Sequence, residues 1–122
     1  MERVPLNFRN NACKISVRIA GSDDEASGFV YRTKPSCEYD YVLTTKHAFQ
    51  EGKEKPEVQN ISKLDIRFEL EHKKQIELYD KNSFEANLMF LEEDMTIIRI
   101  KKQYVPNLQR IVVKNAIETC DN

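Results

Sequence analysis

Hydrophobic and polar residues alternate along much of the chain with the two-residue period of a β-strand. Residues 14–19 read Lys-Ile-Ser-Val-Arg-Ile, which places the aliphatic side chains on one face of a strand and the polar ones on the other. Residues 61–71 repeat the pattern, with leucine, isoleucine and phenylalanine expected to face inward. No stretch shows a sustained helical period that competes with it. The pattern therefore predicts an all-β protein.

The other apolar segments complete a set of six or seven short strands. They are residues 27–32, a strand that begins at Tyr39 and leads to His47, and residues 75–79, 88–91 and 95–101. The polar residues 21–25 and 71–74 predict turns, and residues 50–60 carry glycine and proline among charges, which predicts an exposed loop. Short strands at this spacing are typical of a barrel or a sandwich. We predict a single antiparallel barrel of six or seven strands.

Composition is that of an ordinary folded domain, with no sign of a nucleic-acid or membrane partner. The chain has 122 residues, enough for one hydrophobic core, and 40% of them are hydrophobic. Its 19 basic and 20 acidic side chains are interspersed and give a formal net charge of −1. No window has the apolar length of a membrane span, and the charged N-terminus lacks the apolar core of a signal peptide. We therefore predict a cytoplasmic protein.

The cysteines support the same location. Cys13, Cys37 and Cys120 are odd in number, widely spaced and without the pairing typical of a metal site, so we expect reduced thiols. Cys13 is expected to be a buried apolar thiol and Cys37 a loop thiol. No sequence motif indicates a metal or another cofactor. A metal site built from His47, His72 and a cysteine has no supporting spacing.

Three segments carry a family resemblance. Residues 26–31 read Ala-Ser-Gly-Phe-Val-Tyr, residues 39–50 run from an apolar strand through two threonines into His47, and Asp94 stands directly before an apolar strand. In this order, the segments resemble the N-terminal half of a trypsin-like (chymotrypsin-fold) serine peptidase. The resemblance implies that His47 is the general base and that Asp94 is the acid that orients it. Histidine suits that role because its unperturbed pKa lies near neutral pH.

The resemblance covers nearly the whole chain but only half of a peptidase domain. It implies that residues 1–103 form the N-terminal barrel and that residues 104–122 begin the crossing to a second barrel. No Gly-Asp-Ser-Gly or other nucleophile motif occurs in the sequence. The expected partner is therefore a C-terminal barrel, in the same parent chain or associated with it, that supplies the nucleophile, and the expected substrate is a polypeptide. The apolar face that such a barrel would cover predicts self-association of the isolated chain.

Some residues depart from the family pattern. Thr45 and Lys46 stand where the family usually has small or neutral residues, and Ala26 replaces a common glycine. A lysine beside the histidine could face solvent or could weaken the base. Ala48 follows His47 where secreted members place a bridged cysteine, which implies an intracellular or bacterial-type member. Cys120 follows Asp94 too closely for a nucleophile on a second barrel.

An alternative function stays open. The chain could be a catalytically inert β-barrel that binds a peptide or a protein and only looks like a peptidase. Without catalysis, His47 would be a structural histidine at a strand end, and Asp94 would be an acid at a strand start. His72 lies among charges and is expected to be a solvated surface residue.

Overall fold

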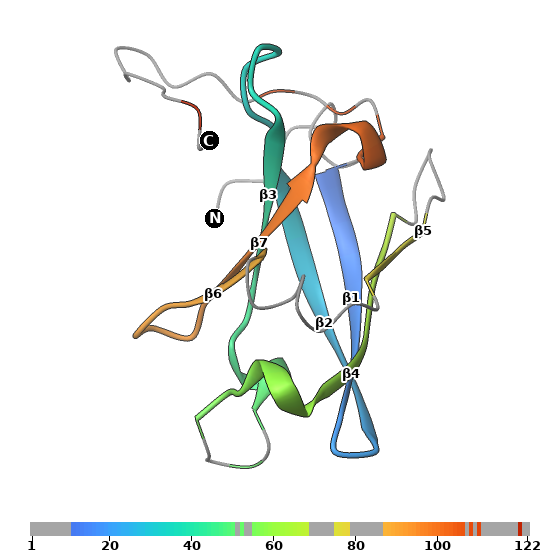
Figure 1. Ribbon diagram of the computed structural model, residues 1–122, viewed down its shortest axis with the longest axis vertical. Coiled ribbons are helices and arrows are strands. Elements are labelled where there is room, and N and C mark those ends of the chain that lie inside the picture. The colour runs from blue at the N-terminus through green and yellow to red at the C-terminus, as the bar shows by residue number, and fades with distance from the viewer. Residues whose placement is uncertain are drawn as a thin grey trace, which may run out of the picture.

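The chain folds into one curled antiparallel sheet of seven strands in the order β5-β4-β1-β2-β3-β7-β6 (Figure 1). The computed structural model describes residues 11–50, 52, 55–68, 75–78, 87–106, 108, 110 and 120. The strands are β1 (Ala12–Ile19), β2 (Ser22–Tyr31), β3 (Tyr39–Thr44), β4 (Ile61–Arg67), β5 (Gln75–Leu78), β6 (Leu88–Phe90) and β7 (Thr96–Lys101). Three 3₁₀ helices, η2 (His47–Phe49), η3 (Val58–Asn60) and η4 (Lys102–Tyr104), connect or follow them. The all-β prediction is confirmed.

The sheet is barrel-like because its inward faces share one core. The alternating residues of β1 are buried as predicted, with Ile15 and Val17 at 0% and 2% exposure. Buried side chains of β2, β3, β4 and β7 belong to the same cluster. The edge strands β5 and β6 follow each other along the chain although they lie at opposite ends of the strand order. A chain that runs from one edge of a curled sheet to the other is the arrangement expected of a barrel.

The first hairpin differs from the prediction. Residues 21–25 were expected to form a polar turn, but β2 begins at Ser22 and pairs with β1 from Ser22 to Phe29. Only Ala20 and Gly21 make the turn, and both have positive φ, which is the conformation that two-residue hairpins favour. The charged residues Asp23, Asp24 and Glu25 belong to β2 because this part of the strand projects into solvent. There, Arg18 Nε and Asp23 Oδ1 form a salt bridge at 2.8 Å. Because Ser22 to Glu25 are exposed on both faces, hydrophobic and polar residues do not alternate in this part of the strand.

A disulfide joins Cys37 to Cys120, which contradicts the predicted reduced state of these thiols. The two cysteines are 83 residues apart in sequence, so their spacing gives no pairing signal, yet the fold brings their Cα atoms to 5.2 Å. Cys13 stays a free, buried thiol, as predicted. Disulfides form in oxidising compartments, so this bond weighs against the predicted cytoplasmic location. Among the described residues, no helix is long and apolar enough to cross a membrane.

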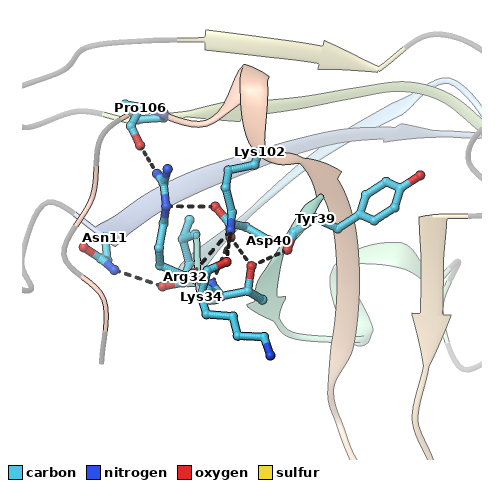
Figure 2. A network of polar contacts seen from close by, with 9 residues as sticks. Asn11, Arg32, Lys34, Tyr39, Asp40, Lys102 and Pro106 are labelled. Carbon is cyan, nitrogen blue, oxygen red and sulfur yellow. Dashed lines mark hydrogen bonds and ion pairs between the residues drawn. The ribbon is translucent and has the colours of Figure 1, made fainter. Parts of the chain in front are cut away.

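A buried carboxylate anchors the start of β3. Asp40 is fully buried, and Figure 2 shows the side chains of Arg32 and Lys102 converging on it. Arg32 Nε lies 3.3 Å from Asp40 Oδ2, and Lys102 Nζ lies 3.7 Å from Oδ1. The Thr33 amide also donates to Oδ1, at 2.9 Å. Burial lowers the pKa of Lys102, whereas the nearby Asp40 charge favours its protonated form.

The same network holds the segment that follows β7. Arg32 donates to the Pro106 carbonyl oxygen, and Lys102 Nζ donates to the Lys34 carbonyl oxygen at 2.6 Å (Figure 2). Pro106 and Leu108 are buried, and Leu108 belongs to the core cluster. These contacts fix one end of β3, and His47 follows the opposite end of the same strand.

Replacement of Asp40 by asparagine is expected to destabilise the fold. The variant leaves two largely buried cations without a counter-charge, which typically costs ~3–5 kcal/mol. We expect a loss of about 3 kcal/mol, at the lower end of that range, because Arg32 and Lys102 keep 17% and 16% side-chain exposure. Urea unfolding measures the change. Glu38→Gln, the same charge change at an exposed neighbour, should stay within about 0.5 kcal/mol of wild type. Equal stability of the two variants would contradict the anchoring role of Asp40.

Candidate active site

His47 lies in a turn whose neighbours are fixed by the core. β3 ends at Thr44, whose hydroxyl donates to the Ser27 carbonyl oxygen at 2.8 Å, and η2 begins at His47. Ala48 and Phe49 are each 1% exposed. The Phe49 ring lies 5.7 Å from the Phe90 ring, centroid to centroid. The backbone of the turn is therefore held on both sides of a histidine whose own side chain faces solvent.

Asp94 lies in the turn between β6 and β7. The Leu91 amide donates to the Met95 carbonyl oxygen at 3.0 Å, which closes this turn. Asp94 precedes β7 by two residues, and β7 pairs with β3 so that Thr96 lies opposite Thr44. The pairing places the turn after β3 and the turn before β7 at the same end of the two strands. Two residues far apart in sequence become neighbours for this reason.

The His47 imidazole and the Asp94 carboxylate are in direct contact. His47 Nδ1 lies 2.7 Å from Asp94 Oδ2. The other carboxylate oxygen, Oδ1, accepts hydrogen bonds from the backbone amides of His47 and Lys46 at 2.8 and 2.9 Å. An ionised carboxylate only accepts hydrogen bonds, so Nδ1 carries the proton in this contact and the neutral ring presents Nε2 as an acceptor. The two residues that the sequence singled out therefore form a hydrogen-bonded dyad.

These hydrogen bonds set the charge state of the carboxylate. The hydrogen bond from the His47 imidazole, followed by the one from the His47 backbone amide, lowers the pKa of Asp94 below its usual range. The dyad is open to solvent, because the His47 side chain is 65% exposed and the Asp94 side chain 54%. Among the described residues, no hydroxyl or thiol contacts the imidazole. The carboxylate is therefore ionised at neutral pH, and the free side of the ring is accessible.

Lys46 does not direct its charge at the imidazole. Its Nζ donates to the carbonyl oxygen of Leu91 at 2.6 Å and to that of Glu92 at 3.1 Å. Both carbonyl groups belong to the turn that carries Asp94. The sequence left two roles open for this lysine, to face solvent or to weaken the base, and neither role describes these contacts. The sequence shows only a lysine beside a histidine, and it gives no signal of where the ammonium group lies.

A small groove lies beside Lys46, the residue before His47. It has a volume of about 280 Å³ and is lined by Lys46, Lys55, Pro56, Phe90, Leu91 and Glu92. Three of these residues are apolar (Pro56, Phe90 and Leu91) and the other three are charged. Such a surface suits an extended peptide side chain with an apolar body.

Among the described residues, the other candidates do not join this site. Cys13 is buried, and burial raises the pKa of its thiol to about 12, which makes it unreactive at neutral pH. Cys120 is held in the disulfide with Cys37 and is no free thiol. His72 lies outside the described residues. Within the described part of the chain, no group of three or more histidine, cysteine, aspartate or glutamate side chains could hold a metal ion.

Comparisons with known proteins add no relative to this picture. No protein-family model, no curated protein and no solved structure matches the chain.

Proposed function

We propose that the chain is the N-terminal part of a trypsin-like serine endopeptidase and supplies the general base and the orienting acid for peptide-bond hydrolysis. The observation that carries the proposal is the contact of 2.7 Å between His47 Nδ1 and Asp94 Oδ2, together with the two backbone amides that donate to Asp94 Oδ1. A histidine held in one tautomer by a carboxylate is the arrangement that general-base catalysis requires. The curled all-β sheet is consistent with a barrel of this family.

The proposed chemistry follows from the two ring nitrogens of His47. The unprotonated Nε2 accepts a proton from a nucleophilic hydroxyl as that hydroxyl attacks the scissile carbonyl carbon. The resulting imidazolium is stabilised by the Asp94 carboxylate at Nδ1 and then donates the Nε2 proton to the leaving amine. Asp94 stays ionised throughout. Its lowered pKa suits this role because the carboxylate persists at the pH at which histidine works as a base.

The nucleophile would come from a second polypeptide unit. The described residues bring no hydroxyl to the imidazole, and the 65% exposure of the His47 side chain leaves room for one. Two exposed apolar side chains belong to β6 and to the turn that follows it: Met89, at 58%, lies on β6, and Met95, at 36%, directly follows Asp94. A second barrel that covered these methionines would exclude water from the dyad. The groove beside Lys46 would then bind a side chain of the polypeptide substrate.

A fluorophosphonate probe tests the proposal, because it reacts covalently only with an activated serine. The chain is expressed with an affinity tag in its native cells as part of whatever longer protein or complex it belongs to there, labelled in the lysate, and captured. We expect a labelled serine within the captured protein or in a polypeptide bound to it. His47→Ala should abolish the label, since the hydroxyl then lacks its base.

Two outcomes would contradict the peptidase function. One is the absence of a labelled serine from the captured material. The other is labelling of equal strength in wild type and in His47→Ala. If the chain still captures a peptide or a protein under either outcome, its function is the alternative one, that of an inert binding module. The exposed Met89 and the small groove are the features that would serve such binding.

The cytoplasmic location stays a prediction, and the disulfide favours an oxidising compartment.

A further inference from the structure

We infer that Lys46 is a positioning residue of the dyad, because its ammonium group holds the turn that carries Asp94 against the turn that carries His47. The catalytic meaning of this contact rests on the proposed function, whereas the contact itself does not. Lys46 departs from the small residues expected beside the histidine, so the family resemblance assigns it no such role.

The contacts of Lys46 span both turns. Its backbone amide donates to Asp94 Oδ1 at 2.9 Å, and its Nζ donates to the Leu91 and Glu92 carbonyl oxygens at 2.6 and 3.1 Å. One residue on the histidine side therefore makes three hydrogen bonds to the four-residue segment that ends in Asp94. Two of them are charge-assisted, which makes them stronger than hydrogen bonds between neutral groups.

Apart from Lys46, the contacts between the aspartate turn and the histidine turn are those of His47, whose amide and imidazole both bond the Asp94 carboxylate. Glu92, Glu93, Asp94 and Met95 are all exposed. The internal hydrogen bonds of the turn are those from the Leu91 amide to the Met95 carbonyl oxygen and from the Met95 amide to the Glu93 carbonyl oxygen. These bonds shape the turn, and they make no contact with the segment that carries His47. Since the Asp94 carboxylate must stay near 2.7 Å from Nδ1 to hold the tautomer, the lysine clamp supplies a constraint that the turn itself lacks.

The imidazole ¹⁵N spectrum of the isolated chain provides the test. At alkaline pH the ring is neutral, and its two nitrogen shifts report which one carries the proton. The variants are Lys46→Met, which keeps the length of the side chain but removes its donors, and Lys46→Arg, which keeps a donor. Lys55→Met is the matched control, since Lys55 borders the same groove but makes no hydrogen bond or ion pair within the described part of the chain. Hydrogen exchange of the residue 46 and residue 47 amides is the second measurement.

We expect wild type, Lys46→Arg and Lys55→Met to show the proton on Nδ1 of His47. In Lys46→Met the population should shift toward the Nε2-protonated tautomer, and the two amides should exchange roughly tenfold faster, as expected for the loss of a typical hydrogen-bond contribution. Exchange of the β1 and β4 amides should not change, which distinguishes a local loosening from a loss of fold.

Either of two results would overturn the positioning role. In the first, Lys46→Met keeps the wild-type tautomer and the wild-type exchange rates. In the second, Lys55→Met changes the spectrum as much as Lys46→Met, which would indicate a general effect of charge. Neither result depends on a nucleophile, so the failure of this inference is distinguishable from the failure of the peptidase function, which the fluorophosphonate label tests separately.

Discussion

If the chain belongs to the proposed peptidase, replacement of Asp94 by asparagine is expected to lower its kcat by about 10⁴-fold, the effect typical of this change in a Ser-His-Asp triad. The side-chain amide of asparagine can turn its NH₂ group toward Nδ1 of His47, which then has to accept instead of donate. The proton moves to Nε2, and the nitrogen that should take the proton from the nucleophile is blocked. KM should change little, because Asp94 does not contact the substrate in the proposed mechanism.

The measurement has two parts that check each other. Steady-state kinetics of the assembled protein gives kcat, and the imidazole ¹⁵N shifts of the isolated chain give the tautomer. Glu93→Gln is the matched control, because it makes the same charge change at the neighbouring exposed acid. A catalytic loss in Asp94→Asn without a change of tautomer would show that the orienting role is wrong. An equal loss of kcat in Glu93→Gln would show that the loss in Asp94→Asn comes from the change in surface charge and not from the orientation of His47.

Removal of the Cys37–Cys120 disulfide is expected to destabilise the chain by about 4.5 kcal/mol, the loop-closure value for a loop of this length. The bond closes a loop whose ends are 83 residues apart. Reduction of the bond therefore increases the conformational entropy of the unfolded chain. Urea unfolding with and without a reductant measures the effect. A loss below about 1 kcal/mol would contradict a stabilising role of the bond.

The double variant Cys37→Ser/Cys120→Ser provides the control. It should be as unstable without reductant as wild type is with it, and the reductant should not change it further. In the folded protein Cys13 takes little part in thiol–disulfide exchange, because burial raises the pKa of its thiol to about 12. A further change on reduction of the double variant would mean that the reductant acts elsewhere.

The sequence predicted the strands where one face is buried and the other is solvated. β1 alternates in exposure along its length, and its aliphatic residues were assigned to the buried face. β3 alternates as well, but its faces were not predicted, and two of its buried residues, Asp40 and Thr44, are polar. The prediction failed at Ser22–Glu25 because both faces of that part of β2 lie in solvent, so side-chain alternation carries no information there. The tight Ala20-Gly21 turn, which depends on positive φ at both positions, set the true strand boundary.

The dyad was predicted from a resemblance and could not have been derived from spacing. His47 and Asp94 meet because β3 pairs with β7, a neighbour that follows it only after three other strands. No local pattern indicates such a long-range pairing. The Lys46 contacts and the disulfide were missed for a related reason. Each joins segments that lie far apart in the sequence, and the presence of a lysine or a cysteine does not indicate which residue it will contact.

The disulfide also gives the molecule a covalent topology with a practical consequence. Residues 37 to 120 form a ring, and both His47 and Asp94 lie on it. A single backbone cut between the two residues would open the ring without releasing a fragment, so the cleaved protein would migrate as one species until it is reduced. Non-reducing electrophoresis alone would therefore score a nicked molecule as intact. His47 and Asp94 would stay joined, because one route between them follows the backbone directly and the other passes through the disulfide, and a single cut breaks only one of the two.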